Sequence, residues 1–103
     1  MESMKFMKLG DLVTLLDSLN EMSYIYIQKG TRSAEAEVAV FPIEAMEEQG
    51  VKPPSDMEYF LEIETAKDVL KAWSFMRGGR LPTTDEKLSA IIYYAENDAY
   101  QPV

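Results

Sequence analysis

One stretch of the chain, residues 35–68, reads EAEVAVFPIEAMEEQGVKPPSDMEYFLEIETAKD and carries most of the information about fold and charge. It holds ten acidic and two basic residues, whereas residues 1–34 and residues 69–103 each carry four acidic and four basic residues. The formal net charge of −8 therefore comes entirely from this middle third. Nucleic acids and anionic membranes are polyanions, so we expect neither as a direct partner and expect a basic protein surface instead.

Three segments in and before this stretch alternate between apolar and polar residues, which is typical of half-buried strands. The alternation predicts strands over residues 22–28, 34–42 and 58–64. Pro42 should end the second strand or place it at an edge, and residues 43–48 have room for one short helical turn before the third. Strands that follow one another in this way favour an antiparallel sheet.

Helices are expected on both sides of these strands. Apolar residues recur at the spacing of one buried helical stripe over residues 9–19, 66–77 and 84–97. Thr83 and Glu86 have the spacing of a capping box at the start of the last helix, and Gly78-Gly79 should stop the helix before it.

The expected fold class is therefore α+β. A three-stranded antiparallel sheet is covered by about three helices, in the order α-β-β-β-α-α, within a single domain spanning residues 1–103. Residues 1–7 are expected to be irregular, with Phe6 and Met7 folding back onto the core. The residues expected to be largely buried are Leu12, Leu16, Ile25, Val38, Leu61, Val69, Trp73, Leu88, Ile91 and Ile92.

The composition removes most familiar catalytic groups. The chain has no cysteine and no histidine, which excludes disulfides, thiolate metal sites and imidazole bases. No Asp-rich calcium-binding run is present, and paired carboxylates would need a substrate cleft that so short a chain can hardly build. We therefore expect no enzyme activity, no cofactor and no metal. The N-terminus lacks the pattern of a signal peptide, so a cytoplasmic location is expected.

The strand parities suggest a candidate partner-binding surface. If the aliphatic faces turn inward, carboxylates and aromatic rings turn outward together, and aromatic residues are enriched where proteins bind one another. The candidate partner-binding residues are Glu35, Glu37, Glu62, Glu64, Tyr24, Tyr26 and Phe60. The alternative is an ordinary solvated face, although like charges on neighbouring strands repel one another and cost stability.

A second candidate cluster lies at the end of the last expected helix. Its members are polar or aromatic groups beyond the stripe that should face the core: Tyr93, Tyr94, Glu96, Asn97, Asp98 and Tyr100. They could serve a small ligand or an accessory function. They could equally be a helix end whose tyrosines pack and whose acids are solvated.

The segments from Leu61-Glu62-Ile63 to Ala66–Trp73 and from Ile92 to Tyr100 resemble a family of small bacterial domains of unknown function. The resemblance covers about residues 9–100, and its most specific part is the C-terminal Tyr-Tyr-Ala-Glu-Asn-Asp-Ala-Tyr. It implies a bacterial or phage setting and assigns no activity and no functional residues.

These observations lead to two hypotheses on function. The first is a non-enzymatic acidic protein that occludes a basic surface, as immunity proteins and phage anti-defence inhibitors do; a nucleic-acid-binding enzyme or a toxin would be such a partner. The second is a small-ligand-binding or accessory domain that uses the cluster around Tyr93–Tyr100.

Overall fold

The computed structural model describes residues 4–103 and shows an α+β fold with one four-stranded sheet. The elements in chain order are β1 (Lys5–Lys8), α1 (Leu9–Leu15), a 3-10 turn (Leu16–Ser18), β2 (Ser23–Gln28), β3 (Glu37–Pro42), α2 (Ile43–Glu47), β4 (Met57–Glu62), α3 (Ile63–Phe75) and α4 (Thr84–Asn97). The expected mixed class and antiparallel pairing are confirmed, but the strand count of three and the order α-β-β-β-α-α are wrong.

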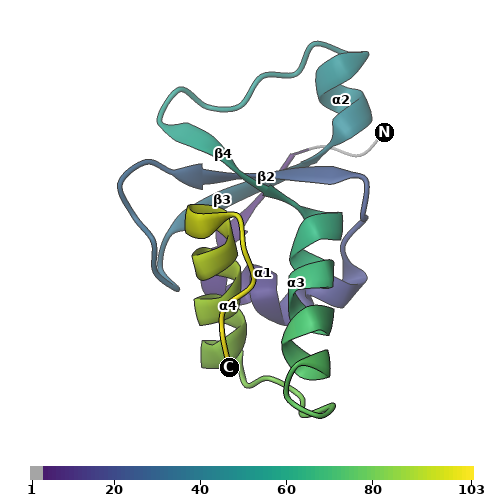
Figure 1. Ribbon diagram of the computed structural model, residues 1–103. Helices are drawn as coiled ribbons and strands as arrows, with labels where there is room; N and C mark the ends of the chain where they lie inside the picture. The colour runs from purple at the N-terminus through teal and green to yellow at the C-terminus, as the bar shows by residue number, and fades with distance from the viewer. Residues whose placement is uncertain (1–3) are drawn as a thin grey trace.

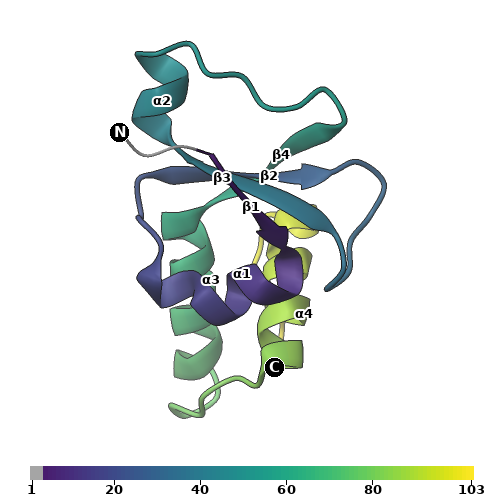
Figure 2. The ribbon, with the colours of Figure 1, turned by 180° about the vertical axis from the view of Figure 1, so that it is seen from behind.

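The four strands lie in the spatial order β1-β3-β2-β4, and every neighbouring pair is antiparallel. Helices α1, α3 and α4 cover one face of the sheet, whereas α2 and the loop after it rise from the other side (Figure 1). Viewed from behind, β1 crosses in front of β3 and leads directly into α1 (Figure 2). We call the face away from α1, α3 and α4 the open face.

Strand β1 corrects the expectation of an irregular N-terminus. Residues 5–8 pair with residues 37–40 of β3 and close that edge of the sheet. Phe6 faces away from the core and is 58% exposed, whereas Met7 packs against the core as expected. The strand has only four residues and lysines at both ends, so its own sequence gives little strand signal; pairing with β3 makes it a strand. Residues 1–3, part of the same prediction, lie outside the described residues.

A β-bulge in β4 corrects the expected direction of Phe60. Leu61 lies opposite Ile25 and Tyr59 lies opposite Tyr26, so Phe60 is the extra residue between the two pairs. Phe60 is 5% exposed and joins the hydrophobic core together with Leu61. Strict alternation along the strand would direct Phe60 outward and Tyr59 inward. The bulge reverses these two directions.

Two boundaries also differ from the expectation. Helix α3 begins at Ile63, three residues before the expected start, because Ile63, Ala66, Val69 and Trp73 form one buried helical stripe. Strand β3 begins at Glu37, and residues 34–35 belong to the turn before it. Residues 35 and 64 therefore lie outside the sheet.

The core lies between the sheet and the three covering helices. Eight of the ten residues expected there are buried, and Leu88 and Ile92 are partly buried against them. Trp73 is 4% exposed, and the guanidinium carbons of Arg77 and Arg80 lie 4.2 and 4.6 Å from its ring centre. Two basic side chains therefore cover the part of this ring that the core leaves uncovered.

The last helix begins and ends as its sequence predicts. Thr83 Oγ1 accepts a hydrogen bond from the Glu86 backbone N–H, and the Glu86 carboxylate accepts one from the Thr83 backbone N–H, which completes the expected capping box. The helix ends at Asn97, where Asp98 takes a left-handed conformation with φ of 52°.

Candidate functional site

The four glutamates expected on one acidic sheet do not form one surface. Glu35 lies in the turn before β3, and Glu64 lies in the first turn of α3, where its charge favours the helix dipole. Glu37 and Glu62 are in the sheet, on β3 and β4 respectively. Between those strands lies β2, so even these two carboxylates are not cross-strand neighbours.

Two glutamates of the sheet have basic partners. The Lys8 ammonium lies 2.8 Å from the Glu37 carboxylate, and this hydrogen bond and charge raise the pKa of Lys8. Arg32 lies 3.0 Å from the Glu58 carboxylate and 5.6 Å from the centre of the Phe60 ring. These carboxylates are therefore already paired within the domain, and the expected anchor Phe60 is covered by Arg32.

The open face instead carries a cluster of aromatic rings from three adjacent strands. Phe41 of β3 is fully buried beneath Tyr24 and Tyr26 of β2, with ring centres 6.4 and 5.3 Å away. Tyr59 of β4 stands nearly perpendicular to both tyrosines, at 6.1 and 5.9 Å. Such edge-to-face contacts stabilise aromatic pairs and hold each ring in a defined orientation.

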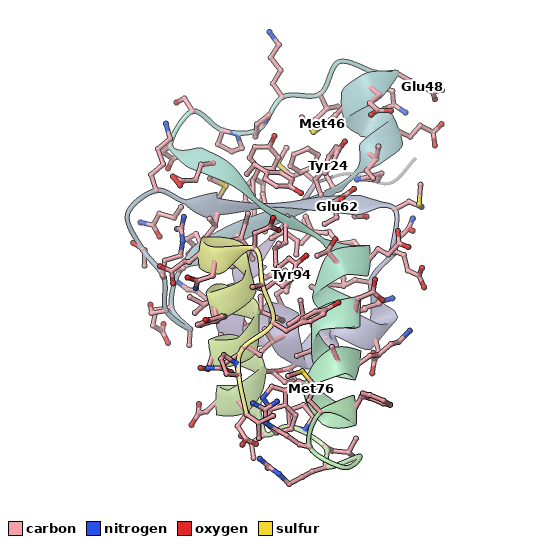
Figure 3. The ribbon with its side chains drawn as sticks, in the orientation of Figure 1. Tyr24, Met46, Glu48, Glu62, Met76 and Tyr94 are labelled. Atoms are coloured by element: carbon pink, nitrogen blue, oxygen red, sulfur yellow. The ribbon has the colours of Figure 1, made fainter. Side chains whose placement is uncertain are left out.

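These tyrosines form one wall of a hollow of about 540 Å³. Helix α2 closes the other side, and Figure 3 shows Tyr24, Met46 and Glu62 converging on the space between α2 and β4. We call this cavity the tyrosine hollow; its lining residues are Tyr24, Tyr26, Met46, Glu47, Tyr59 and Glu62. Its volume falls within the range of roughly 300–1,000 Å³ that is usual for ligand sites.

Two carboxylates give the tyrosine hollow a negative potential. Burial, the charges of Glu47 and Glu62, and a hydrogen bond from its hydroxyl to Glu47 raise the pKa of Tyr24. Burial and the charge of Glu62 raise the pKa of Tyr59. Within residues 4–103, neither Glu47 nor Glu62 forms an ion pair, and no lysine or arginine lines the hollow.

Helix α2 adds further negative charge beside the hollow. It carries Glu44 and Glu47, Glu48 follows directly, and none of its five residues is basic. A hydrogen bond with the Glu44 carboxyl group and the charges of Glu44 and Glu47 raise the pKa of Glu48. Carboxylates crowded in this way favour a cation nearby.

The second candidate cluster is engaged in contacts that hold the C-terminal tail. The rings of Tyr94 and Tyr100 lie 5.5 Å apart, and Asn97 donates a hydrogen bond to the Tyr93 carbonyl group. Beyond Tyr100, Gln101 donates to Ser89, and the Pro102 carbonyl accepts a hydrogen bond from Arg77 of the α3–α4 connection. Glu96 and Asp98 are exposed. A ligand role for this cluster stays a prediction.

Sequence reasoning identified Tyr24, Tyr26 and Glu62 but missed the other half of the tyrosine hollow. Strict alternation with an outward Phe60 predicts an inward Tyr59, which the bulge makes wrong, and Met46 and Glu47 belong to a segment expected to connect two strands. The sequence does contain a signal for the bulge: Phe60 and Leu61 are consecutive large apolar residues. Both are buried, which strict alternation in one strand does not allow.

Two absences bear on the chemistry available to the described chain. Within residues 4–103, no group of three or more His, Cys, Asp or Glu side chains is arranged to hold a metal ion. No helix in the same residues is long and apolar enough to cross a membrane.

By comparison with known families, the chain belongs to the family described as "Domain of unknown function (DUF7716)", whose model matches residues 6–103. No curated protein and no solved structure was found to match. The expected membership of a family of unknown function is thereby confirmed, and the family assigns no activity to any residue.

Proposed function

We propose that this domain is a non-enzymatic binding protein that covers a basic surface of a partner protein with the tyrosine hollow and the acidic helix α2. The observation that carries the proposal is the pairing of aromatic rings with two carboxylates that have no basic partner within residues 4–103. Tyrosines are enriched among the residues that dominate binding energies, and carboxylates beside them that have no basic partner supply charge complementarity.

The net charge of the domain supports the same proposal through association kinetics. A formal charge of −8 on 103 residues creates a long-range field that attracts a basic partner and speeds encounter by roughly 10–10³-fold. An immunity protein or an anti-defence inhibitor would use such a field in the cytoplasm to reach a toxin or a nucleic-acid-binding enzyme before its substrate does. This setting is part of the proposal.

The test is to capture partners from a lysate of the source cells and measure their association kinetics by surface plasmon resonance at about 50 and 300 mM salt. The Debye length shrinks more than twofold over that range, so a steered association should slow markedly. Glu62→Gln should slow association and weaken its salt dependence.

The matched control is Glu64→Gln, which removes the same charge two residues away, on α3 and outside the tyrosine hollow. Equal effects of the two variants would show that only net charge matters. No effect of Glu62→Gln at either salt concentration would exclude this face as the binding site.

A further inference from the structure

The tyrosine hollow has the composition of a site for a single organic cation. Tyr24, Tyr26 and Tyr59 present aromatic rings, whose faces carry negative electrostatic potential and attract cations within about 6 Å. Glu47 of α2 and Glu62 of β4 line the same hollow. Aromatic rings combined with carboxylates bind an ammonium or guanidinium group by cation–π attraction and by charge-assisted hydrogen bonds.

The hollow also suits the apolar stem of such a group. Met46 contributes a flexible thioether side chain that adapts to irregular apolar shapes. Lysine and arginine carry aliphatic stems of three or four carbons that lie well against apolar surface while the charged end pairs with carboxylates. The rings contact one another at 5.9–6.1 Å, so a cation would lie between the ring cluster and α2 instead of between two rings.

We infer that the tyrosine hollow binds one lysine or arginine side chain projecting from the basic surface of the partner. This inference rests on the proposed function and specifies its central contact. The occupant is chosen by charge complementarity. Within residues 4–103 neither carboxylate forms an ion pair, Glu47 accepts a hydrogen bond only from the neutral Tyr24 hydroxyl, and no basic residue lines the hollow. A neutral apolar side chain would gain no charge interaction with either carboxylate and is therefore disfavoured relative to a cation.

The experiment uses three short peptides, Gly-Gly-X-Gly-Gly with blocked ends, where X is lysine, arginine or the uncharged lysine analogue norleucine. Binding to the full chain is followed by NMR signals of ¹³C-labelled tyrosine rings. The lysine and arginine peptides should shift the signals of Tyr24, Tyr26 and Tyr59 saturably and leave that of Tyr100 in place. The norleucine peptide should shift none of them.

Variants then test which groups hold the cation. Tyr59→Leu keeps an apolar side chain but removes the ring, and Glu62→Gln keeps the shape but removes the charge; each should weaken lysine-peptide binding by about fivefold or more. Tyr100→Leu is the matched control, because Tyr100 is 47% exposed and Tyr59 is 50% exposed. Glu64→Gln is the control for charge, and neither control should change binding.

Several results would overturn the inference. Equal binding of the norleucine and lysine peptides would refute recognition of charge, and tighter binding of free putrescine than of the lysine peptide would refute a partner side chain as the occupant. If no peptide binds while partner association still depends on Glu62, the cation site is wrong and the proposed function stands. If the lysine peptide binds in the hollow but no basic partner is captured, the proposed function fails separately.

Discussion

Replacing Trp73 by alanine is expected to destabilise the domain by about 3–5 kcal/mol, the usual loss for a large buried aromatic side chain. The indole is 4% exposed and packs in the core, so its removal leaves a cavity that the surrounding helices fill only in part. The substitution also removes the cation–π attraction of the ring to Arg77 and Arg80, and each of these two contacts contributes roughly 0.5–1 kcal/mol to the stability of the folded domain.

A loss of this size is large for a domain of 103 residues. Small domains are stable by only about 5–15 kcal/mol, so the variant should retain at most about four-fifths of the original stability. At about 4–8 °C per kcal/mol, the melting temperature should fall by roughly 12 °C or more. Urea denaturation measures the free energy of unfolding, and the slope m should stay unchanged because the fold is the same.

The control is Phe75→Ala on the same helix. Phe75 is 85% exposed, so its replacement should change stability by no more than about 0.5 kcal/mol. A loss below about 1 kcal/mol for Trp73→Ala would refute the reasoning, because it would mean that the indole lies at the surface and does not fill the core. An equal loss for both variants would show that burial of the indole is not the cause, because alanine has the higher helix propensity at both positions.

Three further outcomes are expected. Arg80 and the capping hydrogen bonds lower the pKa of Glu86 to about 2. The ionised carboxylate therefore stabilises the folded domain fully above pH about 4.5, and this contribution disappears as the pH falls towards 2. Acid denaturation of the Glu86→Gln variant should show a weaker pH dependence in that window. Thr83→Ala should cost about 1 kcal/mol in urea denaturation, whereas an unchanged midpoint would show that the capping box does not stabilise α4. Burial and nearby carboxylates raise the pKa values of Tyr24 and Tyr59, so an absorbance titration should show two tyrosines that ionise above pH 10, and stability should fall as the pH rises past 10. Ionisation of both at or below pH 10 would contradict the negative potential of the hollow.

Elements governed by local rules could be predicted from the sequence. The capping box of Thr83 and Glu86, the end of α4 at Asn97 and the alternation of Tyr24, Ile25, Tyr26 and Ile27 in β2 all appear as expected. Each depends on residues within one or two turns, or on the period of a single strand, so the information lies close together in the chain. The apolar stripes of the helices and the alternation of the strands predicted eight of the buried residues, five on helices and three on strands.

The candidate site could be predicted only in part, because its geometry depends on pairing between distant segments. β1 becomes a strand by pairing with β3, and Phe60 turns inward because Leu61 and Tyr59 both find partners on β2. Because of that bulge, Tyr59 and not Phe60 lies on the open face. Helix α2 contributes Met46 and Glu47 to the lining of the hollow.

The sequence by itself therefore determined the α+β class, the main helices, the concentration of negative charge in residues 35–68 and the direction of Tyr24 and Tyr26 away from the core. Only the tertiary structure decided which carboxylates are neutralised and which remain unpaired. Lys8 and Arg32 lie far from Glu37 and Glu58 in the chain but pair with them across the fold, whereas Glu47 and Glu62 line the hollow without a basic partner among residues 4–103. Charge interactions depend on distance in space, with a screening length of about 10 Å at 0.1 M salt, and not on separation in sequence, so this distinction exists only in the folded chain.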